Sequence, residues 1–176
     1  MPHTGMIPRL MGTNFASLHP HVQAVHGGNS RRWVGRATVQ RGSHGLLRLA
    51  AVMAGLPASQ HNVPTSVTIM ANEGSETWTR HFGSAVPMRS TLRAKDGLLA
   101  EQLGAVTMQF QIAAHEGGMT WELRRITYLA IPLPRRCFNV QVRADSTGSA
   151  YRFFVAVRLM GLGELIRYEG ELDVTD

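Results

Sequence analysis

From residue 63 onward, the apolar residues of this chain recur with a period of two. In the clearest stretch, Val106, Met108, Phe110 and Ile112 alternate with threonine and glutamine. Successive side chains of a β-strand point to opposite faces, so this alternation predicts a half-buried strand. The same rhythm predicts further strands around Val67, Trp78, Met88, Trp121, Val140, Val155 and Tyr168. The chain is therefore expected to be mainly β-structure.

Short turn segments separate these predicted strands. Asp96-Gly97 is the strongest hairpin signal, because both residues tolerate positive φ. Connections this short join neighbouring strands antiparallel, and a long meander of twisted strands tends to curl on itself. We therefore predict an α+β fold, mainly antiparallel β, formed by a curved sheet or barrel of about nine strands with one or two N-terminal helices. The run 131–134, Ile-Pro-Leu-Pro, is expected to form an edge or a corner.

The first 60 residues follow a different pattern. Residues 1–12 are expected to form a flexible tail, and 13–176 a single antiparallel β-rich domain. A turn is predicted at 13–18, and a short helix from Pro20 to His26 ends at two glycines. Residues 33–41 form the first predicted strand. A second helix is expected at about 44–54, with its buried face marked by Leu46, Leu49, Ala50 and Met53.

Composition restricts the classes of function. The 176 residues include 18 basic and 12 acidic residues, which gives a formal net charge of +6. This charge would suit an anionic partner, but the arginines are spread along the chain and also fit a slightly basic surface. The single cysteine excludes an internal disulfide and a cysteine-rich zinc site. We find neither a signal peptide nor a membrane span, and expect a soluble cytoplasmic protein.

Three charged residues interrupt the predicted apolar faces. Arg80 follows Trp78 by two residues, and Glu101 lies between two leucines at the same spacing. Arg125 continues the apolar face of Trp121. A buried charge must be paired or must contact a ligand. One arginine would form an internal ion pair with Glu101, or would bind a carboxylate. Alternatively, that end of the strand is open to solvent and the arginine stem covers the tryptophan.

Sequence motifs for the common chemistries are missing. The chain has no phosphate-binding loop, no complete dinucleotide fingerprint and no nucleophile elbow. His19, His21 and His26 lie close together in sequence but do not obviously converge, so capping or surface roles are favoured over a metal site. The pairs at 31–32, 124–125 and 135–136 are arginines. They would bind nucleic acid only beside exposed aromatic rings, and most aromatics follow the core pattern.

Several short sequence motifs of this chain resemble those of one family. They are 15–20, Phe-Ala-Ser-Leu-His-Pro, with His26-Gly27; Gly35-Arg36-Ala37 with Arg41-Gly42; Leu56-Pro57; 78–83, Trp-Thr-Arg-His-Phe-Gly; 96–99, Asp-Gly-Leu-Leu, with Glu101; and 132–136, Pro-Leu-Pro-Arg-Arg. In this order they resemble bacterial proteins with domain of unknown function 4166, over residues 12–172. The resemblance transfers no activity, but it directs attention to His26, Arg80 and Glu101. Similar domains are often appended to saccharopine-dehydrogenase-like domains, which implies an oxidoreductase partner.

Four functions are compatible with these observations. The leading hypothesis is a non-catalytic module that binds a small apolar or amphipathic anionic ligand. Its pocket would be lined by Trp78, Trp121, Met108 and Phe110, with Arg80 or Arg125 at the polar end of the ligand. An enzyme would use Glu101 as acid or base and Arg80 as electrostatic stabiliser. The third function is an accessory domain of an oxidoreductase, and the fourth is a nucleic-acid or membrane-surface binder. We assign no catalytic residue, metal or cofactor.

Overall fold

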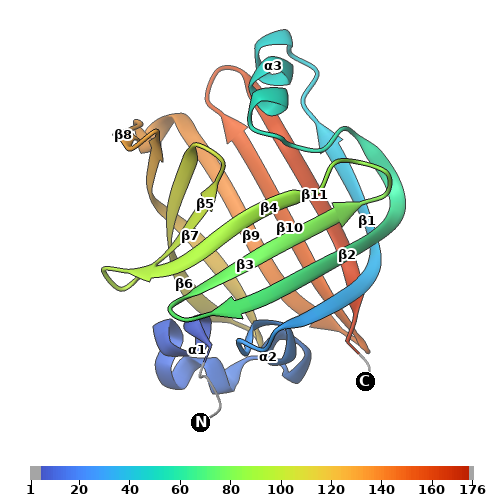
Figure 1. Ribbon diagram of the computed structural model, residues 1–176, viewed down its shortest axis with the longest axis vertical. Helices are drawn as coiled ribbons and strands as arrows, with labels where there is room; N and C mark the ends of the chain where they lie inside the picture. The colour runs from blue at the N-terminus through green and yellow to red at the C-terminus, as the bar shows by residue number, and fades with distance from the viewer. Residues whose placement is uncertain (1–4, 175–176) are drawn as a thin grey trace.

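The computed structural model describes residues 5–174, apart from the side chain of Met53. Its centre is one antiparallel sheet of eleven strands rolled into a barrel (Figure 1). From β1 to β8, and again from β9 to β11, each strand pairs with its neighbour in the chain, as in a meander. The strands are β1 Arg31–Arg41, β2 Gln60–Asn72, β3 Ser75–Phe82, β4 Met88–Lys95, β5 Leu98–Leu103, β6 Val106–His115, β7 Gly118–Tyr128, β8 Ile131–Pro132, β9 Phe138–Thr147, β10 Ala150–Leu159 and β11 Gly163–Asp173.

Ten of the eleven strands form the closed ring. The first and last strands pair with each other, β1 with β11, and this pairing removes both sheet edges. β7 pairs with β6 on one side and with β9 on the other, while β8 is a two-residue strand that pairs with β7. The predicted barrel of about nine antiparallel strands is therefore confirmed. The run at 131–134, expected as an edge or a corner, contains the edge strand: β8 stands at the end of the strand order and pairs with β7. The 3₁₀ turn η2, Arg135–Cys137, follows it.

Two glycines allow β1 and β11 to approach closely at their seam. A Cβ atom added at Gly35 would lie 1.9 Å from the carbonyl oxygen of Glu171. A Cβ atom at Gly170 would lie 2.3 Å from the carbonyl oxygen of Arg36, on the other strand of the pair. No side chain fits at either distance, so the closure of the ring depends on glycine at both positions.

The apolar side chains of the alternating pattern fill the interior in two clusters. The larger cluster adjoins the N-terminal helices and contains Trp33, Trp78 and Trp121, each no more than 6% exposed. The smaller cluster lies toward the opposite end and includes Phe82 and Ile166. The interpretation of the aromatic residues as core is therefore correct. With all three tryptophans buried, none of them is available to stack on a nucleic-acid base.

The N-terminal segment closes one end of the barrel (Figure 1). It consists of α1 Met6–Met11, the 3₁₀ helix η1 Gly12–Ser17 and α2 Pro20–His26, so the predicted turn and helix are present. The tail expected over 1–12 differs in its described part, because Met6, Ile7 and Met11 are buried against the core. Pro8 permits this helix, since a proline in the first helical turn loses no intrahelical hydrogen bond. Residues 1–4 of the expected tail lie outside the described residues.

Helix α3, Gly45–Met53, lies over the opposite end of the barrel (Figure 1). The predicted helix is present, but its predicted buried face is wrong. Leu47 and Ala51 are buried, whereas Leu46, Leu49 and Ala50 are exposed. Leu47 and Ala51 are four residues apart and form a narrow stripe, because only one turn-to-turn line of this short helix contacts the barrel. The side chain of Met53 lies outside the described part. No helix in residues 5–174 is long and apolar enough to cross a bilayer.

Candidate ligand-binding site

The barrel interior contains a cavity of about 180 Å³ between its two ends. Side chains from most of the strands line it, together with Val25 and His26 of α2 and with Ala54 and Leu56, which follow α3. Most lining residues are apolar. An apolar cavity of about 150 Å³ admits a molecule the size of benzene, so this one has room for one aromatic ring or a short aliphatic chain.

Three adjacent strands contribute a hydrogen-bonded charged cluster to the cavity wall. The Arg80 guanidinium, on β3, donates through Nη2 to Oε1 of Glu101 on β5 at 3.0 Å. Ser90, on β4 between them, donates to the same carboxylate oxygen at 2.6 Å and accepts from Arg80 Nη1 at 2.8 Å. Arg80 and Glu101 are 7% and 9% exposed. The strand order places the three side chains together, since alternate residues of β3, β4 and β5 face inward.

The internal ion pair compensates the buried arginine charge. Burial lowers the pKa of the Arg80 guanidinium, but the neighbouring groups, Glu101 first and then Tyr168 and Tyr151, together raise this pKa above its ordinary value. Arg80 also lies over the ring of Trp78, with its guanidinium carbon 5.1 Å from the ring centroid. The arginine is therefore paired inside the protein, and its stem does not simply cover the tryptophan at an end open to solvent.

An aromatic cluster lies beside the ion pair. The His26 ring stacks on Trp78 at a centroid distance of 5.3 Å and meets Trp121 edge-on at 6.5 Å. Its Nε2 atom is 2.8 Å from the Tyr151 hydroxyl on β10. Burial lowers the pKa of His26 to about 3, and the Arg80 charge adds to this effect. The imidazole is therefore neutral at physiological pH, with one nitrogen a donor and the other an acceptor.

Two polar atoms of this cluster are buried without a hydrogen-bond partner. They are Nδ1 of His26 and Nε1 of Trp121, and both side chains line the cavity. An indole N–H can only donate, so Trp121 needs an acceptor. Buried polar groups in folded proteins are nearly always paired, so two unpaired ones on side chains that line one cavity are unusual.

Arg125 does not belong to this site, and the expectation that it points inward is wrong. Residue 125 is exposed, whereas Leu123 and Ile126 are buried. The pairing of β6 with β7 shifts at this point: Gln109 lies opposite Arg125, but Phe110 lies opposite Leu123. The additional residue on β7 is a β-bulge, which reverses the inside-outside alternation beyond it. Without the bulge, Arg125 would have shared the face of Trp121.

Of the candidate residues, the structure brings His26, Trp78, Arg80, Glu101 and Trp121 together. Met108 and Phe110 also line the cavity. Sequence reasoning missed Ser90, Tyr151 and Tyr168, which contact or adjoin this group. Their only sequence signal is their place in the two-residue rhythm. Burial raises the pKa of Tyr168 to about 12, against an opposing effect of Arg80, so its hydroxyl stays protonated.

The other two histidines of the N-terminal segment have separate roles. His19 precedes α2 and accepts the backbone N–H of His21 through Nδ1 at 3.3 Å. The His21 ring is hydrogen-bonded to the Ser146 hydroxyl at 3.0 Å. His26 instead points into the barrel and bonds to Tyr151. Within residues 5–174, no group of three histidine, cysteine or acidic side chains lies close enough to hold a metal ion.

The fold and the interior together define a class: a closed, meandering antiparallel β-barrel with a mostly apolar cavity and a buried, neutralised ion pair. The chain belongs to the family described as Domain of unknown function (DUF4166), whose model matches residues 18–172. The match covers nearly the whole chain and confirms the resemblance carried by its short motifs. Comparisons with curated proteins and with solved structures gave no match.

Proposed function

We propose that the barrel is a non-catalytic binding module for one small, mostly apolar ligand with an uncharged, hydrogen-bond-accepting group. The observation that carries this proposal is the cavity of about 180 Å³, with two buried and unpaired polar atoms on side chains in its wall. Ligand sites in proteins are typically apolar concavities with a few polar groups that orient the ligand. A ten-stranded ring is also wider than the eight-stranded ring that side chains alone fill.

The charge of the interior favours an uncharged ligand over an anion. Glu101 already neutralises Arg80 at 3.0 Å, and Ser90 completes the contact. A ligand carboxylate would add a second negative charge to a site whose one buried guanidinium, Arg80, is already paired. Its desolvation would then be poorly compensated. The polar end of the ligand is therefore better assigned to a neutral group, such as an ester, ketone or ether, than to the anionic group expected from the sequence.

The acceptor group of the ligand would interact with the aromatic cluster. Trp121 Nε1–H is an unpaired donor, and the Trp121 and His26 rings lie 6.5 Å apart. If the Tyr151 hydroxyl donates to Nε2 of His26, then Nδ1–H is a second unpaired donor. Arg80 has five N–H groups and uses two of them in the bonds to Ser90 and Glu101. The site is therefore rich in donors, and its buried cation, Arg80, is paired. Arg143 also borders the cavity, but this residue is exposed on β9.

The geometry of Glu101 does not favour an enzyme. A general acid or base must reach the reacting atom and exchange its proton with solvent or substrate. Here the Glu101 oxygen that faces Arg80 also accepts the Ser90 hydroxyl, and the residue is 9% exposed. A carboxylate oxygen that is hydrogen-bonded to both Arg80 and Ser90 is better suited to a structural role than to proton transfer.

Thermal denaturation with matched ligand pairs tests the proposal. Methyl benzoate and benzoate have nearly the same shape, but only benzoate is charged. We expect the ester to raise the melting temperature and benzoate to have no effect, because ligand binding to the native state alone stabilises it. A rise with benzoate alone would contradict the uncharged form of the proposal. Native mass spectrometry of freshly purified protein would show a bound natural ligand as a mass increment.

A cavity-filling variant provides the control. Val142 lines the cavity from β9, so Val142→Phe should occupy the space and abolish the response to the ester. Val34 is exposed on β1, and Val34→Phe adds the same atoms on the outside. The Val34 variant should respond like the unchanged protein. If Val142→Phe binds the ester equally well, the interior cavity is not the site.

A further inference from the structure

The large apolar side chains exposed by this protein are concentrated at one end of the barrel. Of the eleven found in the described residues, nine lie on α3, or on or directly beside the connections at the same end as α3. The nine are Leu46, Leu49, Val52, Val86, Tyr128, Leu129, Ile131, Met160 and Leu162, and we call them the apolar crown. The other two, Val34 and Met70, lie on strands. None comes from the N-terminal helices or the turns beside them.

The hairpin turns at the two ends of the barrel also differ in their charge. At the end of the N-terminal helices, the hairpin turns contain Glu73-Gly74, Asp96-Gly97, Glu116-Gly117 and Gly148-Ser149. At the α3 end, the four hairpin turns are 83–87, 104–105, 129–130 and 160–162, and they contain no charged residue. Leaving large apolar groups in water is unfavourable, and a contiguous set of them marks an interaction surface.

One turn of the crown has apolar residues at two positions where the backbone conformation favours asparagine or glycine. Leu129 and Ala130 have φ values of 48° and 65°, in the left-handed region that asparagine and glycine adopt most easily. Leu129 is also 65% exposed, so no packing inside the protein compensates for this conformation. Strained residues of this kind persist where they have a function, and here the function would be an external contact.

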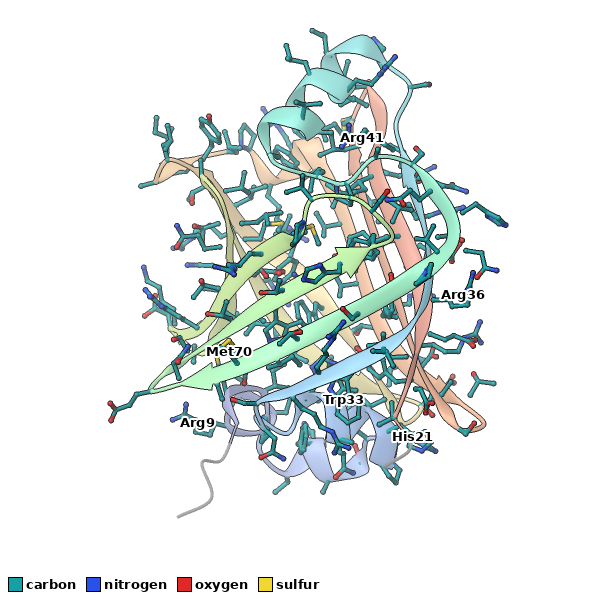
Figure 2. All side chains as sticks on the ribbon, turned by 45° about the vertical axis from the view of Figure 1, so that its right-hand side comes forward. Arg9, His21, Trp33, Arg36, Arg41 and Met70 are labelled. Carbon is teal, nitrogen blue, oxygen red and sulfur yellow. The ribbon has the colours of Figure 1, made fainter. Side chains whose placement is uncertain are left out.

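The charge around the crown is positive. The end segments 41–59, 83–87, 103–106, 128–137 and 158–164 contain five arginines and one acidic residue, Glu164. Arg158 pairs with Glu164, Arg135 pairs with Glu122 of β7, and Arg41 donates to the backbone carbonyls of Leu56 and Pro57. Among the described residues, Arg48 and Arg136 form no ion pair, so these two carry net positive charge at this end. Figure 2 shows Arg41 beside α3, whereas Arg9 and His21 lie at the opposite end. Apolar side chains at projecting positions, surrounded by arginines, are the pattern of surfaces that enter the headgroup region of anionic bilayers.

We propose that the α3 end of the barrel docks on the surface of an anionic lipid bilayer through the apolar crown and its arginines. This inference rests on the proposed function, because a bilayer would be the source or the destination of an apolar ligand. Ala54 and Leu56 follow α3 and line the cavity, so the docking face adjoins the ligand site. The buried N-terminal helices cover the other end. The crown has separate projecting tips on α3 and several turns, which suits a fluid surface better than a rigid partner.

Co-sedimentation with vesicles tests the docking. The protein should bind vesicles of phosphatidylcholine mixed with phosphatidylserine, bind phosphatidylcholine alone much more weakly, and dissociate as salt is raised. The double variant Leu46→Gln, Leu49→Gln should lower binding by at least about tenfold, because two apolar side chains no longer enter the interface. Its matched control is Val34→Gln, Met70→Gln, which changes two apolar residues on strands that are also more than half exposed, and this variant should bind normally.

The arginines and the strained turn provide two further variants. Arg48→Gln with Arg136→Gln should weaken binding to the anionic vesicles by about tenfold, whereas Arg89→Gln with Arg93→Gln, on β4, should have little effect. The variant Leu129→Asn, Ala130→Gly places residues that favour positive φ in this turn, so the barrel should fold while the vesicle affinity falls. Loss of binding in this well-folded variant separates a contact role from a structural one.

The outcomes distinguish this inference from the proposed function. If the unchanged protein responds to methyl benzoate but does not sediment with either vesicle, the docking inference is wrong and the binding module stands. If it sediments as described but no ligand stabilises it, the cavity proposal fails and only a surface contact remains. Crown variants that change the oligomeric state in solution, without any vesicle binding in the parent, would show that the crown contacts a second copy of the chain instead.

Discussion

The two ends of this barrel have opposite chemistry, although the same ten strands reach both. At the closed end, Met6 and Ile7 of α1 and Val22 of α2 are buried against the core, and three of the four neighbouring hairpin turns contain an acidic residue. At the α3 end, Leu46 and Leu49 remain in water beside arginines. The apolar pattern inside the barrel accounts for its stability, but it does not account for the apolar residues exposed at the α3 end. The docking that we propose is one physical reason for this difference.

The largest change in the free energy of unfolding is expected at the internal ion pair, which lies in the barrel interior between the two ends. Glu101→Gln removes the charge that compensates Arg80, and should lower the free energy of unfolding by about 3–5 kcal/mol. Chemical denaturation measures this change. The double variant Arg80→Leu, Glu101→Leu leaves no buried charge and should recover most of the loss. A double variant as unstable as the single one would mean that the strand packing, rather than the charge, sets the cost.

Truncating one large apolar side chain to alanine at each end of the barrel tests the comparison directly. Ile7 is completely buried at the closed end, so Ile7→Ala should lower the free energy of unfolding by about 2–4 kcal/mol. Leu49 is 59% exposed on α3, and Leu49→Ala should change it by less than about 0.5 kcal/mol. Urea unfolding of both variants measures the contrast. Equal losses at the two ends would contradict the asymmetry.

Acid should destabilise the closed end through His26. Its pKa is lowered from 6.5 to about 3 by burial, so between these values the unfolded chain binds a proton that the folded protein does not. The free energy of unfolding should therefore be insensitive to His26 above pH 6.5. As the pH is lowered from 6.5 to 3, the free energy of unfolding should fall by about 1.4 kcal/mol for each pH unit. His26→Gln, compared with the parent from about pH 7 to about pH 4.5, should remove this part of the slope.

The smallest effect is expected from changing one α3-end turn into the type found at the other end. Leu129→Asn with Ala130→Gly relieves two left-handed residues and should raise the free energy of unfolding by up to about 1 kcal/mol. Thermal denaturation measures this gain. Asp96-Gly97, at the closed end, already has the favourable residues and serves as the reference for the new turn. A loss of stability would mean that Leu129 packs within the fold.

Much of the site was predictable because it follows from spacing alone. Arg80 and Glu101 each occupy an inward position of an alternating strand, and a buried charge requires a partner, so an internal ion pair could be named among the possible arrangements. Ser90 could not be identified in this way. Its importance comes from β4 lying between β3 and β5, and many serines occupy equivalent positions of the pattern.

The amino-acid order alone determined the strands, most of the turns, the helices α2 and α3, and the inward direction of Trp78, Arg80 and Glu101, because these depend on local periodicity and local backbone preferences. The tertiary structure decided the rest. Pairing of β1 with β11 closes the ring, the bulge beside Gln109 turns Arg125 outward, and the narrow contact of α3 leaves Leu46 and Leu49 in water. Each of these three features depends on which distant segment packs alongside. The alternating apolar pattern does not identify that segment, because every strand has the same period of two.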